Sequence, residues 1–182
     1  MKPWERLDRT TLVDTPFLKV YSDKIRLPNG SPIDDYTVVK KRDIVVIVAT
    51  DEDNKLITFK EYKYAANEML LTLPAGQIDK GESAKAAAER ELLEETGYTG
   101  NDFEVVNILN EYPTKDLHTL TVVRARNVRL TSTVHHEETE NIGDIQLMTI
   151  SELKASIKNG DWKTTGALAA LIVGLPELFT DN

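Results

Sequence analysis

Three glutamates, Glu91, Glu94 and Glu95, crowd the last turns of a segment that is predicted to be a helix. At about 100° per residue, all three fall on one face of that helix. Their negative charges lie near the partial negative charge of the helix C-terminus, which is unfavourable. They also repel one another by about 0.2–0.5 kcal/mol per pair. Bound Mg²⁺ or Mn²⁺ would relieve this repulsion, because hard cations prefer carboxylate oxygens. The alternative is a solvated acidic face, and the spacing alone leaves both open.

The residues before the glutamates are small. Ala84, Ala87 and Ala88 lie on the same stripe one or two turns earlier, so another segment can pack closely there. Gly97 stands where a left-handed helix cap is expected. We therefore expect the acidic end of the helix to lie beside a packing contact.

The spacing around these residues resembles the Nudix box, Gx5Ex7REUxEExGU, where U is a bulky apolar residue. Gly76, Glu82 and the segment 90–97 supply all seven fixed letters, and only Tyr98 departs, as an aromatic where an aliphatic is usual. With residue frequencies near 7%, such a match arises by chance in about one of 10⁸ windows. The chain is therefore identified as a member of the Nudix family.

This resemblance implies a mixed α/β fold, a Nudix-like α/β/α sandwich with a mixed β-sheet. It implies the hydrolysis of a nucleoside diphosphate linked to another group. It also assigns roles to the box: Glu91, Glu94, Glu95 and the carbonyl of Ala75 become metal ligands, and Glu94 and Arg90 belong to the catalytic set. Glu82 lies opposite Glu91 on the helix wheel, so we expect it to have a structural role at the helix start, with a water-mediated metal contact as the alternative. Arg90 is expected to hold the glutamates in position, and Gly76 to let the backbone turn toward the metal.

A further carboxylate should accept the proton of the attacking water. In related enzymes this base often lies on a loop before a late strand, which here is residues 135–144, "HHEETENIGD". Counting back from the following strand favours Glu140, with Glu138 and Glu137 as substitutes. For each of them, plain solvation of an acidic loop remains the alternative.

Features outside the box resemble the ADP-ribose/ADP-sugar pyrophosphatase branch of the family. Pro113 lies sixteen residues after Gly97, the place of that branch's marker proline. By position, Phe17 and Tyr36 would stack on a base, with Trp4 as a less supported stacker. For the aromatic residues, core or dimer packing is an equal alternative.

Two lysines, Lys41 and Lys63, would be the cations near the diphosphate by the same resemblance. Three departures leave the base and the sugar open. Lys63 replaces an arginine and loses its bidentate fork, Thr72 stands where glutamate is common, and "YPTKDLHTL" lacks the usual "SPG".

The elements that must position these residues mix without regular βαβ alternation, which favours a mixed sheet with helices on its faces. The expected strands are "IVVIVA" at 44–49, which forms a hairpin with 55–63, and three more within 103–112, 117–128 and 144–150. The expected helices are 151–160, which Ser151 could cap, and 164–179. Residues 1–42 are expected to form a small antiparallel β-segment that dimerises. Residues 43–182 would form the Nudix hydrolase domain.

The composition limits the possible partners. The chain has 182 residues, 41% of them hydrophobic, a net charge of −8 and no cysteine. This charge argues against binding of nucleic acid or an anionic membrane by electrostatics alone. No apolar run is long enough to span a bilayer. We expect a cytoplasmic homodimer.

The predicted function is metal-dependent cleavage of ADP-ribose or a related nucleoside diphosphate sugar to a nucleoside monophosphate and a sugar phosphate. One alternative is a Nudix hydrolase of another linked nucleotide, such as a GDP- or UDP-sugar or a dinucleoside polyphosphate. The other is a nucleotide-binding module without catalysis.

Overall fold

The structure is a computed structural model that describes residues 2–132 and 142–180 of the chain. The chain divides into two compact units. The first, here called the N-terminal unit, consists of Met1–Asp43 and Asn110–Thr119; the second, the large unit, consists of Ile44–Leu109 and Leu120–Asn182. The segment Asn110–Thr119, although distant in sequence, thus belongs with the N-terminal strands.

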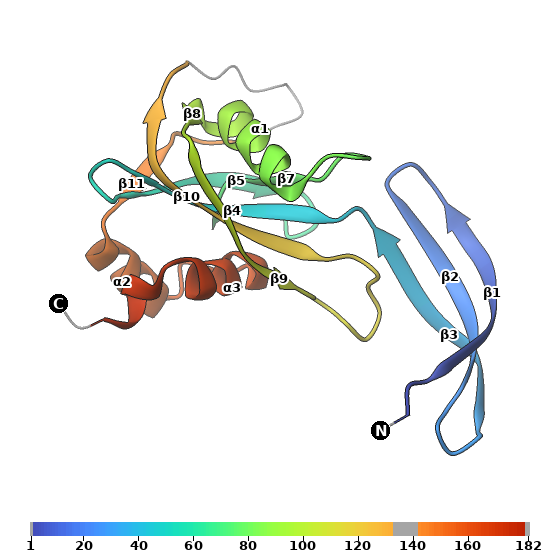
Figure 1. The fold of residues 1–182 in the computed structure, drawn as a ribbon. Coiled ribbons are helices and arrows are strands. Elements are labelled where there is room, and N and C mark those ends of the chain that lie inside the picture. The colour runs from blue at the N-terminus through green and yellow to red at the C-terminus, as the bar shows by residue number, and fades with distance from the viewer. Residues whose placement is uncertain (1, 133–141, 181–182) are drawn as a thin grey trace. The chain divides into compact units, whose positions relative to one another are not determined.

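The N-terminal unit is an antiparallel sheet in the order β1–β2–β3, as the sequence predicts (Figure 1). Its strands are β1 (Glu5–Asp14), β2 (Leu18–Arg26) and β3 (Pro32–Lys41). The turn between β2 and β3 contains Gly30 at φ +90°, a left-handed conformation that glycine adopts without strain. Val39 of β3 also exchanges backbone hydrogen bonds with Lys115 and Leu117, at 2.8 and 2.7 Å, so residues 110–119 are attached to β3.

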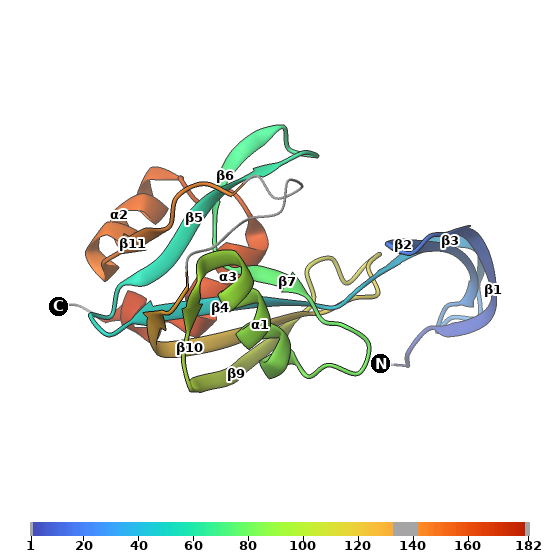
Figure 2. The ribbon, with the colours of Figure 1, turned by 90° about the horizontal axis from the view of Figure 1, so that it is seen from above.

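The large unit contains a mixed sheet. Its strands are β4 (Ile44–Asp51), β5 (Leu56–Lys63), β6 (Glu68–Thr72), β7 (Ala75–Gln77), β8 (Tyr98–Thr99), β9 (Asp102–Leu109), β10 (Leu120–Leu130) and β11 (Gln146–Met148). β4 and β10 pair in parallel, and the other pairs are antiparallel. Figure 2 shows β6 continuing the sheet beside β5.

Helices cover both faces of this sheet (Figure 1). α1 (Ala84–Thr96) lies on one face, and α2 (Ile150–Asn159) and α3 (Thr165–Gly174), followed by the short 3-10 helix η1 (Pro176–Phe179), lie on the other. Alternate residues of β4 divide between two buried clusters: Val45 and Ile47 pack with α1, while Val46 and Val48 pack with α2 and α3. The predicted mixed α/β sandwich is therefore confirmed.

The helix ends follow from local capping. The Ser83 side chain accepts a hydrogen bond from the Ala86 N–H, and Gly97 closes α1 at φ 72°. In α2 the cap is Thr149, so the prediction of Ser151 is wrong. Thr149 and Glu152 form a reciprocal capping box, which starts the helix earlier than the first serine suggests. Among the helices within residues 2–132 and 142–180, none combines the length and apolar character that a membrane crossing needs.

Candidate active site

Glu95, in the last turn of α1, is the most buried carboxylate of the box. The residue is 8% exposed, and its Oε2 accepts a hydrogen bond from the Ala75 N–H at 2.9 Å. Burial raises the pKa of Glu95 to about 8, and the Ala75 hydrogen bond only partly opposes this effect. The charges of Glu91 and Glu61 raise the pKa further, while the Lys63 ammonium lowers it. The site therefore disfavours the negative charge of Glu95 unless a cation is added.

Glu91 lies against Gly76, the residue that follows Ala75 in β7. A Cβ atom added to Gly76 would stand 1.9 Å from the carboxyl carbon of Glu91. This position therefore has room for glycine alone while Glu91 keeps its place. Glu91 and Glu95 are one helical turn apart, so α1 brings their carboxylates to adjacent residues of β7, Ala75 and Gly76.

Arg90 connects the carboxylates of the box to one another. Its Nη1 donates to Glu91 Oε1 at 2.8 Å and to Glu94 Oε2 at 3.1 Å. Its Nε and Nη2 donate to Glu82 at 3.1 and 3.0 Å, and Nη2 also donates to the Gln77 carbonyl at 3.0 Å. These bonds raise the pKa of Arg90, and the contact with Glu82 contributes most. In turn, the hydrogen bonds from Arg90 lower the pKa of Glu82. The contacts are those of an arginine that orients acids, while its part in catalysis stays a prediction.

The donor set fits a hard divalent cation, because Glu91 and Glu95 offer carboxylate oxygens. No three acidic or histidine side chains form a ready-made metal group among the residues that the structure describes. Two carboxylates converge at β7, while the Glu94 side chain is 58% exposed and bonded to Arg90. A cation would offset the burial of the Glu95 charge. The Ala75 group that contacts Glu95 is the N–H, so metal binding by its carbonyl stays a prediction.

A second acid, which the sequence analysis did not single out, lies near Glu95. Glu61 Oε1 accepts a hydrogen bond from Lys63 Nζ at 2.5 Å, and both charges act on the pKa of Glu95. Lys63, predicted to be a cation near the diphosphate, is therefore close to the box helix. The two-residue spacing of Glu61 and Lys63 on a strand was the available signal, because such residues share one face of the sheet.

The predicted substrate residues of the N-terminal unit gather around segment 110–119. The Tyr36 hydroxyl donates to the Thr114 carbonyl at 2.6 Å, the Lys115 ammonium lies 3.8 Å from the Tyr36 ring centroid, and Trp4 meets this ring edge-on at 5.8 Å. Lys41 Nζ donates to Asp116 Oδ2 at 2.5 Å. Lys115 and Asp116 were missed by the sequence analysis, which had no local pattern to pair them with β3.

Two further predicted substrate residues have fewer contacts. Phe17 is 77% exposed just before β2, and Pro113 lies in the turn that precedes Asp116. The candidate bases Glu138 and Glu140, with Glu137, lie outside the described residues. Their role therefore stays a prediction.

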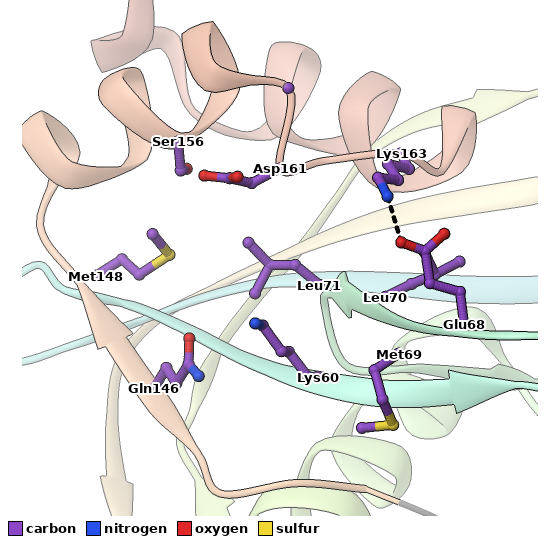
Figure 3. Close-up of a pocket in the computed structure, with 11 residues that line it drawn as sticks. Lys60, Glu68, Met69, Leu70, Leu71, Gln146, Met148, Ser156, Asp161 and Lys163 are labelled. Atoms are coloured by element: carbon purple, nitrogen blue, oxygen red, sulfur yellow. Dashed lines mark hydrogen bonds and ion pairs between the residues drawn. The ribbon is translucent and has the colours of Figure 1, made fainter.

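A separate cavity of about 380 Å³ lies on the sheet face covered by α2 (Figure 3). Lys60 of β5 points toward it, and Met148 and Asp161 line it. An ion pair between Lys163 and Glu68 closes one side (Figure 3). The described residues that line this cavity include none of the predicted site residues, so it is distinct from the carboxylate cluster.

Comparison with known proteins finds two matching family models and a similar solved structure. Residues 40–168 match the family described as NUDIX domain, and residues 4–39 match the nucleoside diphosphate sugar hydrolase N-terminal domain. The solved structure entitled "Crystal structure of ADP compounds hydrolase" superimposes with a TM-score of 0.80 and 24% identity, covering 95% of this chain and 92% of that one. This likeness supports the fold.

Two curated relatives match parts of the chain. The "Methanol dehydrogenase activator" of Bacillus methanolicus is 32% identical over 48% of this chain and 46% of its own length. The "ADP-ribose pyrophosphatase" of Bacillus subtilis is 34% identical over 45% of this chain and 44% of its own length. The chain thus spans less than half of each relative. Because the NUDIX domain match covers well over half of its residues, the chain belongs to the Nudix family.

Proposed function

We propose that the chain is a metal-dependent pyrophosphohydrolase that cleaves the diphosphate of ADP-ribose or a related nucleoside diphosphate sugar. The products would be a nucleoside monophosphate and a sugar phosphate. The observation that carries this proposal is the convergence of Glu91 and the buried Glu95 on adjacent residues of β7. The match of residues 4–39 to a nucleoside diphosphate sugar hydrolase domain and the name of the Bacillus subtilis relative support the substrate class.

Nudix hydrolases generally need divalent metal ions. Glu91, Glu94 and Glu95, with the Ala75 carbonyl, would hold Mg²⁺ or Mn²⁺, and Arg90 would keep the carboxylates oriented through its present hydrogen bonds. A bound divalent ion supplies positive charge to phosphate oxygens and lowers the pKa of a water molecule. Glu95 must lose its proton to act as a ligand, which its raised pKa opposes until a cation is present.

The other predicted residues would bind the substrate or accept the proton of the attacking water. Lys63 and Lys41 would neutralise phosphate charge, with the Lys41 ammonium held in position by Asp116. Tyr36 and Phe17 would stack on the base, with Pro113 shaping the adjoining turn. Glu140 or Glu138 would take the proton of the attacking water. These roles rest on the resemblance to the family branch, supported by the contacts of Tyr36 and Lys41 with segment 110–119.

A cytoplasmic homodimer is part of the proposal. Among the described residues of the N-terminal unit, only Ile25 and Val38 are buried apolar side chains. Several apolar residues of this unit are instead exposed: Trp4, Leu7, Leu12, Val13, Phe17 and Leu18. An exposed apolar surface on so small a unit favours burial against a second copy. Light scattering that finds a monomer at micromolar concentration would contradict the dimer.

A substrate panel tests the function. ADP-ribose, ADP-glucose, GDP-mannose, UDP-glucose and diadenosine polyphosphates are incubated with the protein and Mg²⁺, and phosphatase then releases phosphate from the products. We expect turnover of ADP-ribose or ADP-glucose, and loss of this turnover in Glu95→Gln. Preference for a GDP- or UDP-sugar or a dinucleoside polyphosphate would establish the alternative hydrolase. Tight ADP-ribose binding without turnover, unchanged by Glu95→Gln, would establish a binding module.

A further inference from the structure

Neighbouring residues of β5 face opposite sides of the sheet. Leu56 packs in the cluster with α2 and α3, and Ile57 packs in the cluster with α1. Farther along the strand, Lys60 points toward the cavity on the α2 face (Figure 3). Glu61, the next residue, must then face α1. The effect of its charge on the pKa of Glu95 agrees with this placement.

Glu61 is held firmly by its backbone. It pairs with Leu70 of β6 on one side and bridges to Ile142 on the other. Its side chain is 21% exposed, whereas that of Lys63, at the end of β5, is 45% exposed. A strand held on both sides fixes the direction of a carboxylate, while a lysine has a long flexible stem. Glu61 is thus the fixed member of this ion pair.

The Lys63 ammonium has two acidic neighbours, Glu61 and Glu95. It is hydrogen-bonded to Glu61, and it influences Glu95 only through space. The one hydrogen bond described for the Glu95 carboxyl group comes from a backbone N–H, so no described side-chain cation is hydrogen-bonded to it. An ammonium that moved onto Glu95 would occupy the carboxylate that a divalent ion needs.

We propose that Glu61 is a positioning residue that holds the Lys63 ammonium away from Glu95, and so keeps the Glu95 carboxylate available for a divalent cation. This inference rests on the metal site of the proposed function. It differs from a ligand role, because Glu61 acts here through Lys63. A negative charge beside the site would by itself weaken the binding of an anionic substrate. The positioning role explains why Glu61 is nevertheless acidic.

A double-mutant cycle on Mn²⁺ binding tests this proposal. Free Mn²⁺ is measured by electron paramagnetic resonance, without substrate, for the unaltered protein, Glu61→Gln, Lys63→Met and the double variant. We expect Glu61→Gln to weaken Mn²⁺ binding by about three- to tenfold, because the freed ammonium then pairs with Glu95. Lys63→Met should bind Mn²⁺ as tightly as the unaltered protein or more tightly. The double variant should match Lys63→Met within about twofold.

The cycle distinguishes the alternatives. If Glu61→Gln weakens Mn²⁺ binding equally with and without Lys63, then Glu61 is a ligand or a simple negative charge, and the proposal is overturned. Weaker binding in Lys63→Met alone would also overturn it, and this variant leaves Glu61 in place should Glu61→Gln fail to fold. Glu68→Gln is the matched control, since it removes the carboxylate of the Lys163 ion pair on β6 (Figure 3). It should leave Mn²⁺ binding unchanged.

The same titration separates this inference from the proposed function. If Glu95→Gln abolishes Mn²⁺ binding but the cycle is additive, the metal site stands and the role of Glu61 fails. If Glu95→Gln leaves Mn²⁺ binding unchanged, both fail. Thermal unfolding in EDTA checks that each variant is folded.

Discussion

The backbone N–H of Ala75 donates a hydrogen bond to Glu95 Oε2 at 2.9 Å and so joins the last turn of α1 to β7. This bond favours the ionised carboxylate, but burial has the larger and opposite effect. The metal-free protein therefore holds a carboxyl group whose charge is unfavourable near neutral pH.

The stability of the metal-free protein should fall as the pH rises from about 5 to 8. The pKa of Glu95 is raised from 4.5 to about 8 in the folded chain, so the folded state binds this proton more strongly than the unfolded state. This contribution to the free energy of unfolding is fully present below pH 4.5 and is lost as the pH rises through the folded pKa. At about 1.4 kcal/mol per pKa unit, the loss amounts to several kcal/mol. Urea unfolding in EDTA across this range measures it.

Glu95→Gln should abolish this pH dependence, because the amide has no proton to lose. Glu94→Gln is the control, since the Glu94 side chain is 58% exposed, and the pH dependence should remain in that variant. An equal slope in Glu95→Gln and the unaltered protein would show that another group titrates.

Gly76→Ala should damage the site more than the fold. The added Cβ would stand 1.9 Å from the Glu91 carboxyl carbon, so the carboxylate must move. We expect the turnover of the best substrate to fall by about 100-fold, as displacement by about 1 Å can do. Near-normal kcat/KM in Gly76→Ala would contradict this view of Glu91.

Arg90→Lys should weaken metal binding while keeping the positive charge. Lysine cannot reproduce the fork that contacts Glu82, Glu91 and Glu94 together. We expect a loss of about 10–100-fold in metal affinity or activity, as for other residues that orient metal ligands. Lys85→Met, which removes an exposed partner of Glu89 at 3.9 Å, should change neither. Calorimetry with Mg²⁺ and steady-state kinetics measure the two effects.

Asp116→Asn should raise KM by about two- to fivefold and leave kcat nearly unchanged. Its carboxylate, 11% exposed, holds the Lys41 ammonium, and a looser cation binds phosphate less well. Asp14→Asn is the control, since it removes the exposed partner of Lys19 on β2. A fall in kcat at constant KM would instead indicate a role in the chemical step.

The sequence predicts the elements that have strong local signals. The apolar run at 44–49, the box helix and its cap Gly97 were all predictable, because their patterns lie within a few residues. The strands β6, β7 and β8, with five, three and two residues, were not predicted. Such short strands are defined by their partners across the sheet, which periodicity does not reveal.

In the candidate site, too, some features are predicted by local sequence patterns and others are not. The spacing of the box predicts that Glu91 and Glu95 share a helix face, but not that β7 brings Gly76 against the Glu91 carboxylate. The contact of Lys41 with Asp116 joins residues 75 positions apart and depends on how segment 110–119 attaches to β3. Contacts of this kind follow from tertiary packing, which no local pattern encodes.

The most direct test of the central claim is calorimetric titration of the protein with Mg²⁺ at pH 7, in two buffers that differ in ionisation enthalpy. If Glu95 and Glu91 hold the ion, the unaltered protein should bind Mg²⁺ and release close to one proton, because Glu95 starts protonated with a pKa of about 8. Glu95→Gln should bind weakly and release none. Equal Mg²⁺ binding by the unaltered protein, Glu91→Gln and Glu95→Gln, without proton release, would contradict the account.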